Sequence, residues 1–126
     1  MKYSVKTLDI TLTPAISDYL EKKLSRIEKF ISPEMMSTLV CDIELGKATN
    51  HHKTGDVFVT AINIVSGSVS LNAKAEEMDL YASIDVAVAE MGEILKAAKG
   101  KRDSLLRKGG SKLKSLMKKF YSDDTR

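Results

Sequence analysis

Basic residues recur at short, regular intervals in two parts of this sequence, and such residues can bind phosphate groups. Lys23, Arg26 and Lys29 recur at every third position, and Lys96 and Lys99 repeat that spacing. On a helix, such residues lie on one face. Arg can grip a phosphate through two hydrogen bonds, whereas Lys acts as a point charge. Two such rows on adjacent helices could follow a phosphate backbone. The alternative is an ordinary solvated surface, which the interspersed acids favour for the first row.

The basic character is concentrated near the end of the sequence. Residues 96–120 hold ten Lys and Arg and a single acid, Asp103. From residue 96 onward the net charge is +8, and residues 1–95 have a net charge of −5. This asymmetry favours contact with a polyanion, either nucleic acid or an anionic membrane, over a merely solvated tail. The further candidate RNA-binding residues in this stretch are Lys101, Arg102, Arg107 and Lys108.

The last part of this segment also has an apolar stripe. Leu113, Leu116, Met117 and Phe120 follow the i, i+3, i+4, i+7 pattern among lysines, which is typical of a basic amphipathic helix. Such a helix could dock in a groove of another protein, fold along RNA, lie on an anionic membrane, or pack on its own domain or a second copy. The sequence leaves these open. A membrane-surface or protein-docking module is therefore the main rival to an RNA-binding protein.

Enzymatic chemistry has little support in the sequence. His51 and His52 are adjacent in a polar segment, where neighbouring side chains diverge, and no second ligand follows at helical spacing. The single cysteine, Cys41, lies within an apolar alternation and is interpreted as a small buried residue. No phosphate-binding glycine motif or nucleophile motif occurs. We expect no enzyme, no metal, no cofactor and no small-molecule substrate.

Length and composition predict one domain with a tail. The 126 residues are 43% hydrophobic and 29% charged, as in ordinary globular proteins. No apolar run approaches the length of a membrane span, and the start alternates polar and apolar residues, unlike a secretory signal. We expect a cytoplasmic protein with an α+β domain over residues 1–108 and a basic amphipathic or flexible tail over residues 109–126.

Hydrophobic periodicity predicts the order β-α-β-β-β-α. Period-two alternation and β-branched residues predict strands at 2–7, 38–45, 56–65 and 66–75, with the third strand packed on more than one side. A hairpin turn is expected at Ser66-Gly67, and a loop at 46–56. The predicted helices cover 14–31 and a stretch opening near residue 76, where three acids suit a helix start. One four-stranded sheet with both helices on one face is the simplest solution.

Two stretches resemble a known family. LTPAISDYLEKKLSRIEKF on the first helix and AKAEEMDLYASID before the second are similar to the ribosome hibernation-promoting factors, which include the ribosome-associated inhibitor. The resemblance covers about residues 1–102. The predicted element order agrees with the fold of that family, which is like a double-stranded-RNA-binding domain.

The resemblance implies a factor that binds the small ribosomal subunit in the channel used by messenger and transfer RNA. It would inhibit translation under stress or in stationary phase, through basic residues of its two helices. The sequence departs from the family in two ways. First, Glu90 and Glu93 stand where family members often have basic residues in the middle of the second helix, and Gly92 between them would loosen that helix. The second departure is the length of the sequence. Only some two dozen residues follow Arg102, so a short form without the dimerising C-terminal domain is expected.

Overall fold

A single four-stranded sheet forms one layer of the protein. The computed structural model describes residues 1–49 and 55–108, with side chains over 1–48 and 55–99. The strands are ordered β1-β2-β3-β4, with β1 parallel to β2 and the other pairs antiparallel. Their bounds are Tyr3–Leu8 for β1, Val40–Thr49 for β2, Asp56–Ser66 for β3 and Val69–Glu77 for β4. The predicted α+β class and four-stranded sheet are confirmed.

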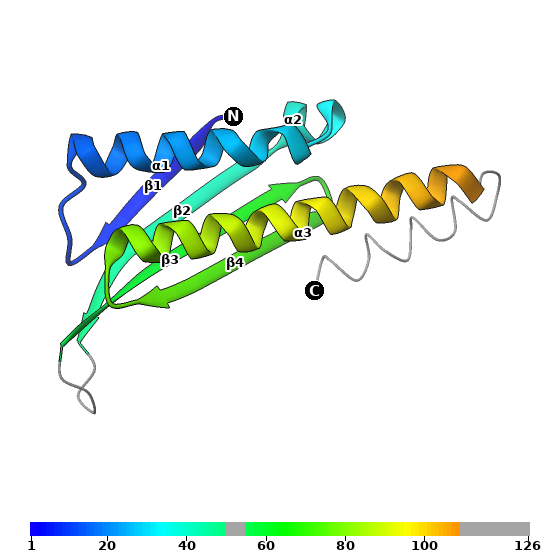
Figure 1. The fold of residues 1–126 in the computed structure, drawn as a ribbon. Coiled ribbons are helices and arrows are strands. Elements are labelled where there is room, and N and C mark those ends of the chain that lie inside the picture. Colours follow the sequence, from blue (N-terminus) through cyan, green and yellow to red (C-terminus); the bar gives the residue numbers. More distant parts are fainter. Residues whose placement is uncertain (50–54, 109–126) are drawn as a thin grey trace.

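Two long helices form the second layer on one side of the sheet. They are α1, Pro14–Ile27, and α3, Leu80–Lys108, and they run side by side in the same direction (Figure 1). Thr13 caps α1, because its Oγ1 accepts a hydrogen bond from the Ile16 amide at 3.2 Å. Pro14 follows at a position where a helix needs no amide hydrogen. The two predicted long helices are thus present on one face.

A short third helix was not predicted. The first helix was expected to reach residue 31, but α1 ends at Ile27 and continues as a 3-10 turn, Glu28–Phe30. The new helix, α2, spans Pro33–Thr38 and starts as α1 does, since the Ser32 hydroxyl accepts from the Met35 amide. Its far end is tied to β3, because Ser66 Oγ hydrogen-bonds Thr38 Oγ1 at 2.6 Å.

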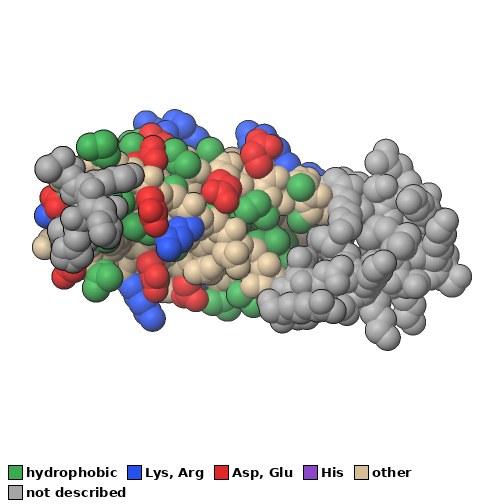
Figure 2. Space-filling model, turned by 90° about the horizontal axis from the view of Figure 1, so that it is seen from below, with side chains coloured by type: hydrophobic (Ala, Val, Ile, Leu, Met, Phe, Trp, Pro, Cys, Tyr) green, Lys and Arg blue, Asp and Glu red, His purple; other side chains and the backbone are tan. Residues whose placement is uncertain are grey.

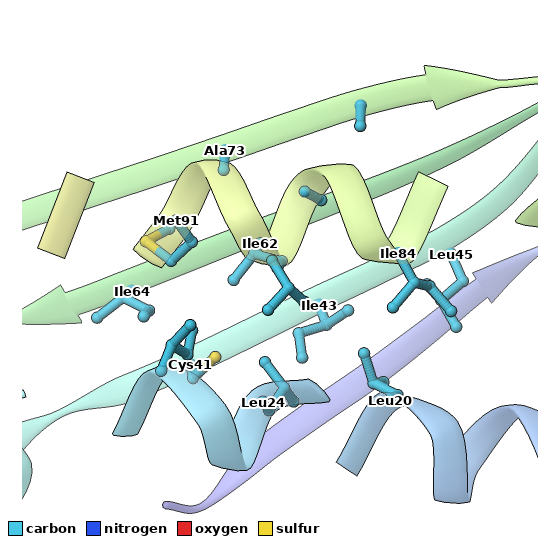
Figure 3. Close-up of a cluster of buried hydrophobic side chains, with 14 of the residues drawn as sticks. Leu20, Leu24, Cys41, Ile43, Leu45, Ile62, Ile64, Ala73, Ile84 and Met91 are labelled. Carbon is cyan, nitrogen blue, oxygen red and sulfur yellow. The ribbon is translucent and has the colours of Figure 1, made fainter. Parts of the chain in front are cut away.

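The hydrophobic core fills the space between the sheet and the two long helices. Leu20 and Leu24 of α1 and Ile84 and Met91 of α3 point toward the strands (Figure 3). The sheet contributes alternate residues of its inner face to the same cluster, namely Cys41, Ile43, Leu45, Ile62, Ile64, Leu71, Ala73 and Ala75. Such burial is the main stabilising term, and it fixes α1 and α3 relative to each other.

The second long helix begins later than the sequence predicted. Glu76 and Glu77 belong to β4, where they pair with Val59 and Phe58 of β3, and are not in the first helical turn. Pairing with an apolar neighbouring strand therefore prevails over the helix-start signal. Asp79 does act at the start of α3, because its Oδ2 accepts from the Ala82 amide at 3.0 Å.

Two expectations about β3 also need correction. Its apolar run predicted packing on more than one side, but both long helices cover one face, and Val65 is exposed on the other. The turn after β3 is Gly67-Ser68, one residue later than expected, because Ser66 pairs with Val69. Gly67 has φ +61°, a conformation that glycine adopts without strain. The strand β2 also continues to Thr49, through residues expected in a loop.

Candidate nucleic-acid interface

The candidate interface lies along the line where α1 and α3 touch. Contacts pair Tyr19 with Asp85 near the start and Phe30 with Lys96 near the end, so the two helices advance together. Between these points a Cβ added to Gly92 would lie 3.2 Å from Ile27 Cγ2. Gly92 thus permits close helix packing, and α3 passes through it without a break, contrary to the expected loosening. Close packing brings the side chains of both helices within reach of one another.

Lys23 is engaged within the protein. Its Nζ lies 3.1 Å from Asp85 Oδ1 and 5.3 Å from the centroid of the Tyr19 ring, and its side chain is 21% exposed. Tyr19 donates its hydroxyl hydrogen to the same carboxylate oxygen at 2.5 Å. Tyr81 packs edge-on against Tyr19, with ring centroids 4.9 Å apart. The predicted three-residue row is therefore interrupted, because the charge of Lys23 is compensated by Asp85.

The ionisation of this cluster follows from its contacts. The hydrogen bond from Tyr19 holds the pKa of Asp85 below its usual value, and Lys23 acts in the same direction. The same bond raises the pKa of Tyr19, because the phenol hydrogen is held by a carboxylate. Asp85 therefore stays ionised at neutral pH and keeps Lys23 paired.

Phe30 brings basic residues of the two helical segments together. Lys29, in the 3-10 turn after α1, places its Nζ 5.3 Å from the Phe30 ring centroid. Lys96, on α3, places its Nζ 4.8 Å from the same centroid. Cations over an aromatic face are attracted to the ring, by about 0.5–1 kcal/mol at exposed sites. Two of the predicted residues, far apart in sequence, are thereby held in one place.

We call Arg26, Lys29, Lys96 and Lys99 the basic seam. All four are exposed. Arg26 lies in the last turn of α1, where the helix dipole favours a cation, and Lys99 follows Lys96 by one turn of α3. The seam thus presents one guanidinium and three ammonium groups near the junction of the helices. Such groups suit phosphate oxygens.

The remaining predicted site residues lie outside the described side chains. The backbone of α3 extends through Lys101, Arg102, Arg107 and Lys108, whose side chains are not among those described. The predicted tail over residues 109–126 also lies outside the described residues, as do His51 and His52. The proposed roles of these residues in binding therefore stay predictions.

Acidic side chains limit the seam on one side. Glu90 and Glu93 are exposed on α3, and Glu93 Oε1 accepts from Lys96 Nζ at 3.2 Å. On the surface seen in Figure 2, acidic and basic side chains are interspersed and form no large area of one sign. The described interface is a short group of cations at the end of α1, in the 3-10 turn after it and in the second half of α3, with acidic side chains beside it.

Features of enzymes are weak in the described part. No group of three or more His, Cys, Asp or Glu side chains that could hold a metal ion occurs within the described residues. Cys41 is 2% exposed, and burial raises the pKa of its thiol to about 11, with Asp42 contributing. The thiol is thus protonated and inert at neutral pH, as expected of a buried cysteine. None of the helices in the described ranges has the length and apolar character of a membrane span.

Sequence reasoning missed the residues that organise this interface. Tyr19, Phe30 and Asp85 each contact a predicted lysine, and none was selected. A signal did exist, because Tyr19 precedes Lys23 by four positions and Phe30 adjoins Lys29. Asp85 could not be selected in the same way, because its partner is on another helix.

Comparisons with known proteins match most of the chain to one protein family. A family described as Sigma 54 modulation protein / S30EA ribosomal protein matches residues 3–103. A ribosome hibernation promotion factor of Bacillus subtilis (strain 168) is 25% identical over 125 residues, or 99% of this chain. The chain spans 62% of the length of that relative.

Solved structures share the fold. The Thermus thermophilus Protein Y N-terminal domain is 26% identical, with a TM-score of 0.60, over 75% of this chain and 93% of that chain. A ribosomal subunit interface protein from Coxiella burnetii has a TM-score of 0.57 at 22% identity, over 78% of this chain and 99% of that chain. The second likeness supports the fold alone.

Proposed function

This chain belongs to the family of sigma 54 modulation proteins and S30EA ribosomal proteins, and from that premise we propose that it is a ribosome hibernation factor. It binds the small ribosomal subunit through the basic seam and blocks the channel for messenger and transfer RNA. Translation is thereby inhibited under stress or in stationary phase. With ribosomes as its partner, the protein would act in the cytoplasm.

The observation that carries this proposal is the convergence of Lys29 and Lys96 on the ring of Phe30. Preplaced cations lose less side-chain freedom on binding than free lysines do. Arg26 and Lys99 extend the cluster on either side, and the backbone of α3 carries further basic residues beyond it. A phosphate backbone is the ligand that suits such a surface.

The proposed mechanism is steric exclusion without covalent chemistry. A folded two-layer domain that occupies the channel prevents messenger and transfer RNA from entering it. Release of counterions drives such binding, so affinity depends steeply on salt. If 6 to 10 phosphates are neutralised, affinity falls by roughly 10³ to 10⁵ between about 50 and 200 mM salt.

Sedimentation with ribosomes tests the proposal. The full chain is centrifuged through sucrose gradients with ribosomes and separated subunits at about 50 and 200 mM salt. We expect stoichiometric binding to the small subunit at low salt, weaker binding at high salt, and competition by messenger and transfer RNA bound beforehand. No binding at low salt, or retention on anionic vesicles alone, would contradict the proposal and favour the membrane-surface alternative.

Matched variants assign the binding to one face. Lys29→Gln with Lys96→Gln removes two charges from the basic seam, and Lys6→Gln with Lys74→Gln removes two from the opposite face of the sheet. Each lost phosphate contact lowers the salt slope by about 1. We expect a lower slope for the first pair and an unchanged slope for the second. Equal effects would mean that net charge, and not the seam, governs binding.

A further inference from the structure

An apolar groove lies between α2, the turn that joins β3 to β4, and α3, which lie near one another at one end of the sheet (Figure 1). Its apolar lining consists of Phe30, Met35, Val69, Leu95 and Ala98, and only Leu95 is fully buried. The groove has a volume of about 280 Å³, just below the roughly 300–1,000 Å³ of pockets for drug-sized ligands. It therefore suits one small ring system.

The charged residues of this groove differ between its walls. Lys99 is exposed on the α3 wall, whereas Glu34 is exposed on the α2 wall. Lys96 adds a second cation beside the groove, because its Nζ lies 4.8 Å from the ring centroid of Phe30, which is a lining residue. A ligand that complements both walls has an anionic group on the side of α3 and a hydrogen-bond donor on the side of α2.

We propose that the groove binds one unstacked base of single-stranded RNA. The exocyclic amino group of the base donates to the Glu34 carboxylate, and the neighbouring phosphates contact Lys96 and Lys99. Carboxylates accept hydrogen bonds from such amino groups, and apolar side chains hold bases that leave the stack. A carboxylate offers about four acceptor positions, so Glu34 can receive this hydrogen alongside its contacts within the protein. This binding mode rests on the proposed function, which supplies the RNA strand.

The two walls also favour one class of base. Cytosine and adenine have an amino group where uracil has a carbonyl oxygen, and an oxygen facing the Glu34 carboxylate finds no donor. A paired base keeps this edge engaged with its partner and stays stacked in the duplex. Phosphate contacts alone carry no sequence information. The groove would thus give the basic seam a preference for single strands with amino-bearing bases. An apolar side chain of a protein partner would use the lining but neither charged wall.

An NMR titration of the isotope-labelled full chain tests this binding mode. Three single-stranded hexamers of equal charge are compared at about 50 mM salt, namely hexacytidylate, hexauridylate and a ribose-phosphate strand without bases. We expect hexacytidylate to shift the amide signals of Gly67, Ser68 and Val69 in the turn that borders the groove. It should bind about tenfold more tightly than hexauridylate, the factor given by one charge-assisted hydrogen bond. The abasic strand should shift Lys96 and Lys99 but not the turn.

Matched variants identify the groove as the binding site. Ala98→Leu fills the groove, and Ala97→Leu adds the same bulk at an exposed position of α3 outside the groove lining. We expect only Ala98→Leu to abolish the preference for hexacytidylate and the shifts of the turn. Glu34→Gln should also remove the preference, because an amide can donate to the uracil oxygen as well as accept from cytosine. Equal effects of the two leucine variants, or equal binding of hexacytidylate and hexauridylate by the wild type, would overturn the proposal.

Sedimentation with ribosomes separates this proposal from the proposed function. A wild-type chain that binds the small subunit, but whose turn signals do not respond to hexacytidylate, would contradict the base-binding groove alone. Base-dependent shifts of the turn without ribosome binding would support the groove and contradict the proposed function. Turn signals that shift with protein concentration in the absence of RNA, and not with hexacytidylate, would assign the groove to a second copy of the chain instead.

Discussion

Lys29 and Lys96 lie on different helical segments, yet their Nζ atoms are 5.3 and 4.8 Å from the centroid of one aromatic ring, that of Phe30. Like charges repel, so two ammonium groups need a reason to share a location. The ring supplies it, because its electron-rich faces attract cations. The cluster holds two positive charges beside one ring, and the charge of Lys96 is also paired with the exposed carboxylate of Glu93.

Removal of the Phe30 ring should uncouple Lys96 from it. We expect Phe30→Leu and Lys96→Met to be coupled by about 0.5–1 kcal/mol in a double-mutant cycle of unfolding free energy, because each change removes the same cation–ring contact. Urea denaturation of the four proteins gives this value. Phe30→Tyr keeps a ring and should keep the coupling. Strictly additive effects would show that the contact contributes nothing.

The Asp85 carboxylate should stabilise the protein in a pH-dependent way. Its folded-state pKa is lowered by Tyr19 and Lys23, so its stabilisation is present above the unfolded pKa of about 3.9 and is lost as pH falls through the folded pKa. Asp85→Asn should therefore cost stability at neutral pH and converge with the wild type in acid. Denaturation at a series of pH values measures this difference.

Glu90→Gln is the matched control for that series, because Glu90 is an exposed carboxylate on the same helix. We expect its effect on stability to be small across the range. If Asp85→Asn lowered stability equally at every pH, the contact would act through packing and not through charge. In ribosome binding, Asp85→Asn should steepen the salt dependence, because it releases Lys23 from its ion pair.

The buried hydroxyl pair of Thr60 and Ser83 should respond unequally to mutation. Their Oγ atoms are 2.7 Å apart, and Ser83 Oγ also donates to the Leu80 carbonyl at 2.7 Å. Since Ser83 has one hydrogen, Thr60 must be the donor between them. Ser83→Ala leaves the Thr60 hydrogen without that acceptor in the core and should cost about 1–3 kcal/mol, more than Thr60→Val.

Thermal and urea denaturation of the two single variants and the double variant check this asymmetry. In the Thr60→Val background, Ser83→Ala should cost less than it does alone, because no hydroxyl is left without its partner. A larger cost for Thr60→Val than for Ser83→Ala would reverse the assigned donor and contradict the interpretation.

The Cys41 thiol should react only when the protein opens. It is buried on β2 and its pKa is about 11, so little thiolate is present near neutral pH and reagents have no access. We expect no maleimide labelling of the native protein by mass spectrometry and complete labelling in urea. Ser68→Cys, on the exposed turn, should label at once. Rapid native labelling of Cys41 would mean that β2 opens readily.

Hydrophobic periodicity predicted the parts of the fold that face the core. In the helix predicted over residues 14–31, helical spacing puts Ile16, Leu20, Leu24, Ile27 and Ile31 on one face, and all five are buried. The period-two alternation over residues 66–75 likewise puts Leu71, Ala73 and Ala75 on one face, and all three are buried. These patterns work because burial follows directly from which face of an element meets the other layer.

Local sequence signals gave the wrong secondary structure where contacts with residues distant in sequence determined it. Glu76 and Glu77 resemble a helix start, but the adjacent strand β3 keeps them in β4. The Ser32-Pro33 pair repeats the Thr13-Pro14 signal, yet the short α2 has no fully buried residue whose spacing could reveal it. For the interface, spacing gave the residues of each row, but not the pairing of Lys23 with Asp85 across the helices.

The parallel contact between β1 and β2 has a consequence for the order of folding. The strands β2, β3 and β4 are neighbours along the chain, whereas β1 reaches β2 only across α1, the 3-10 turn and α2. Contacts between distant segments form late, because a longer loop must close first. We expect the antiparallel strands with α3 to form the folding nucleus, and β1 with α1 to join afterwards. The N-terminal residues, which are synthesised first, would reach their final structure last. The basic seam would be complete only when α1 packs against α3.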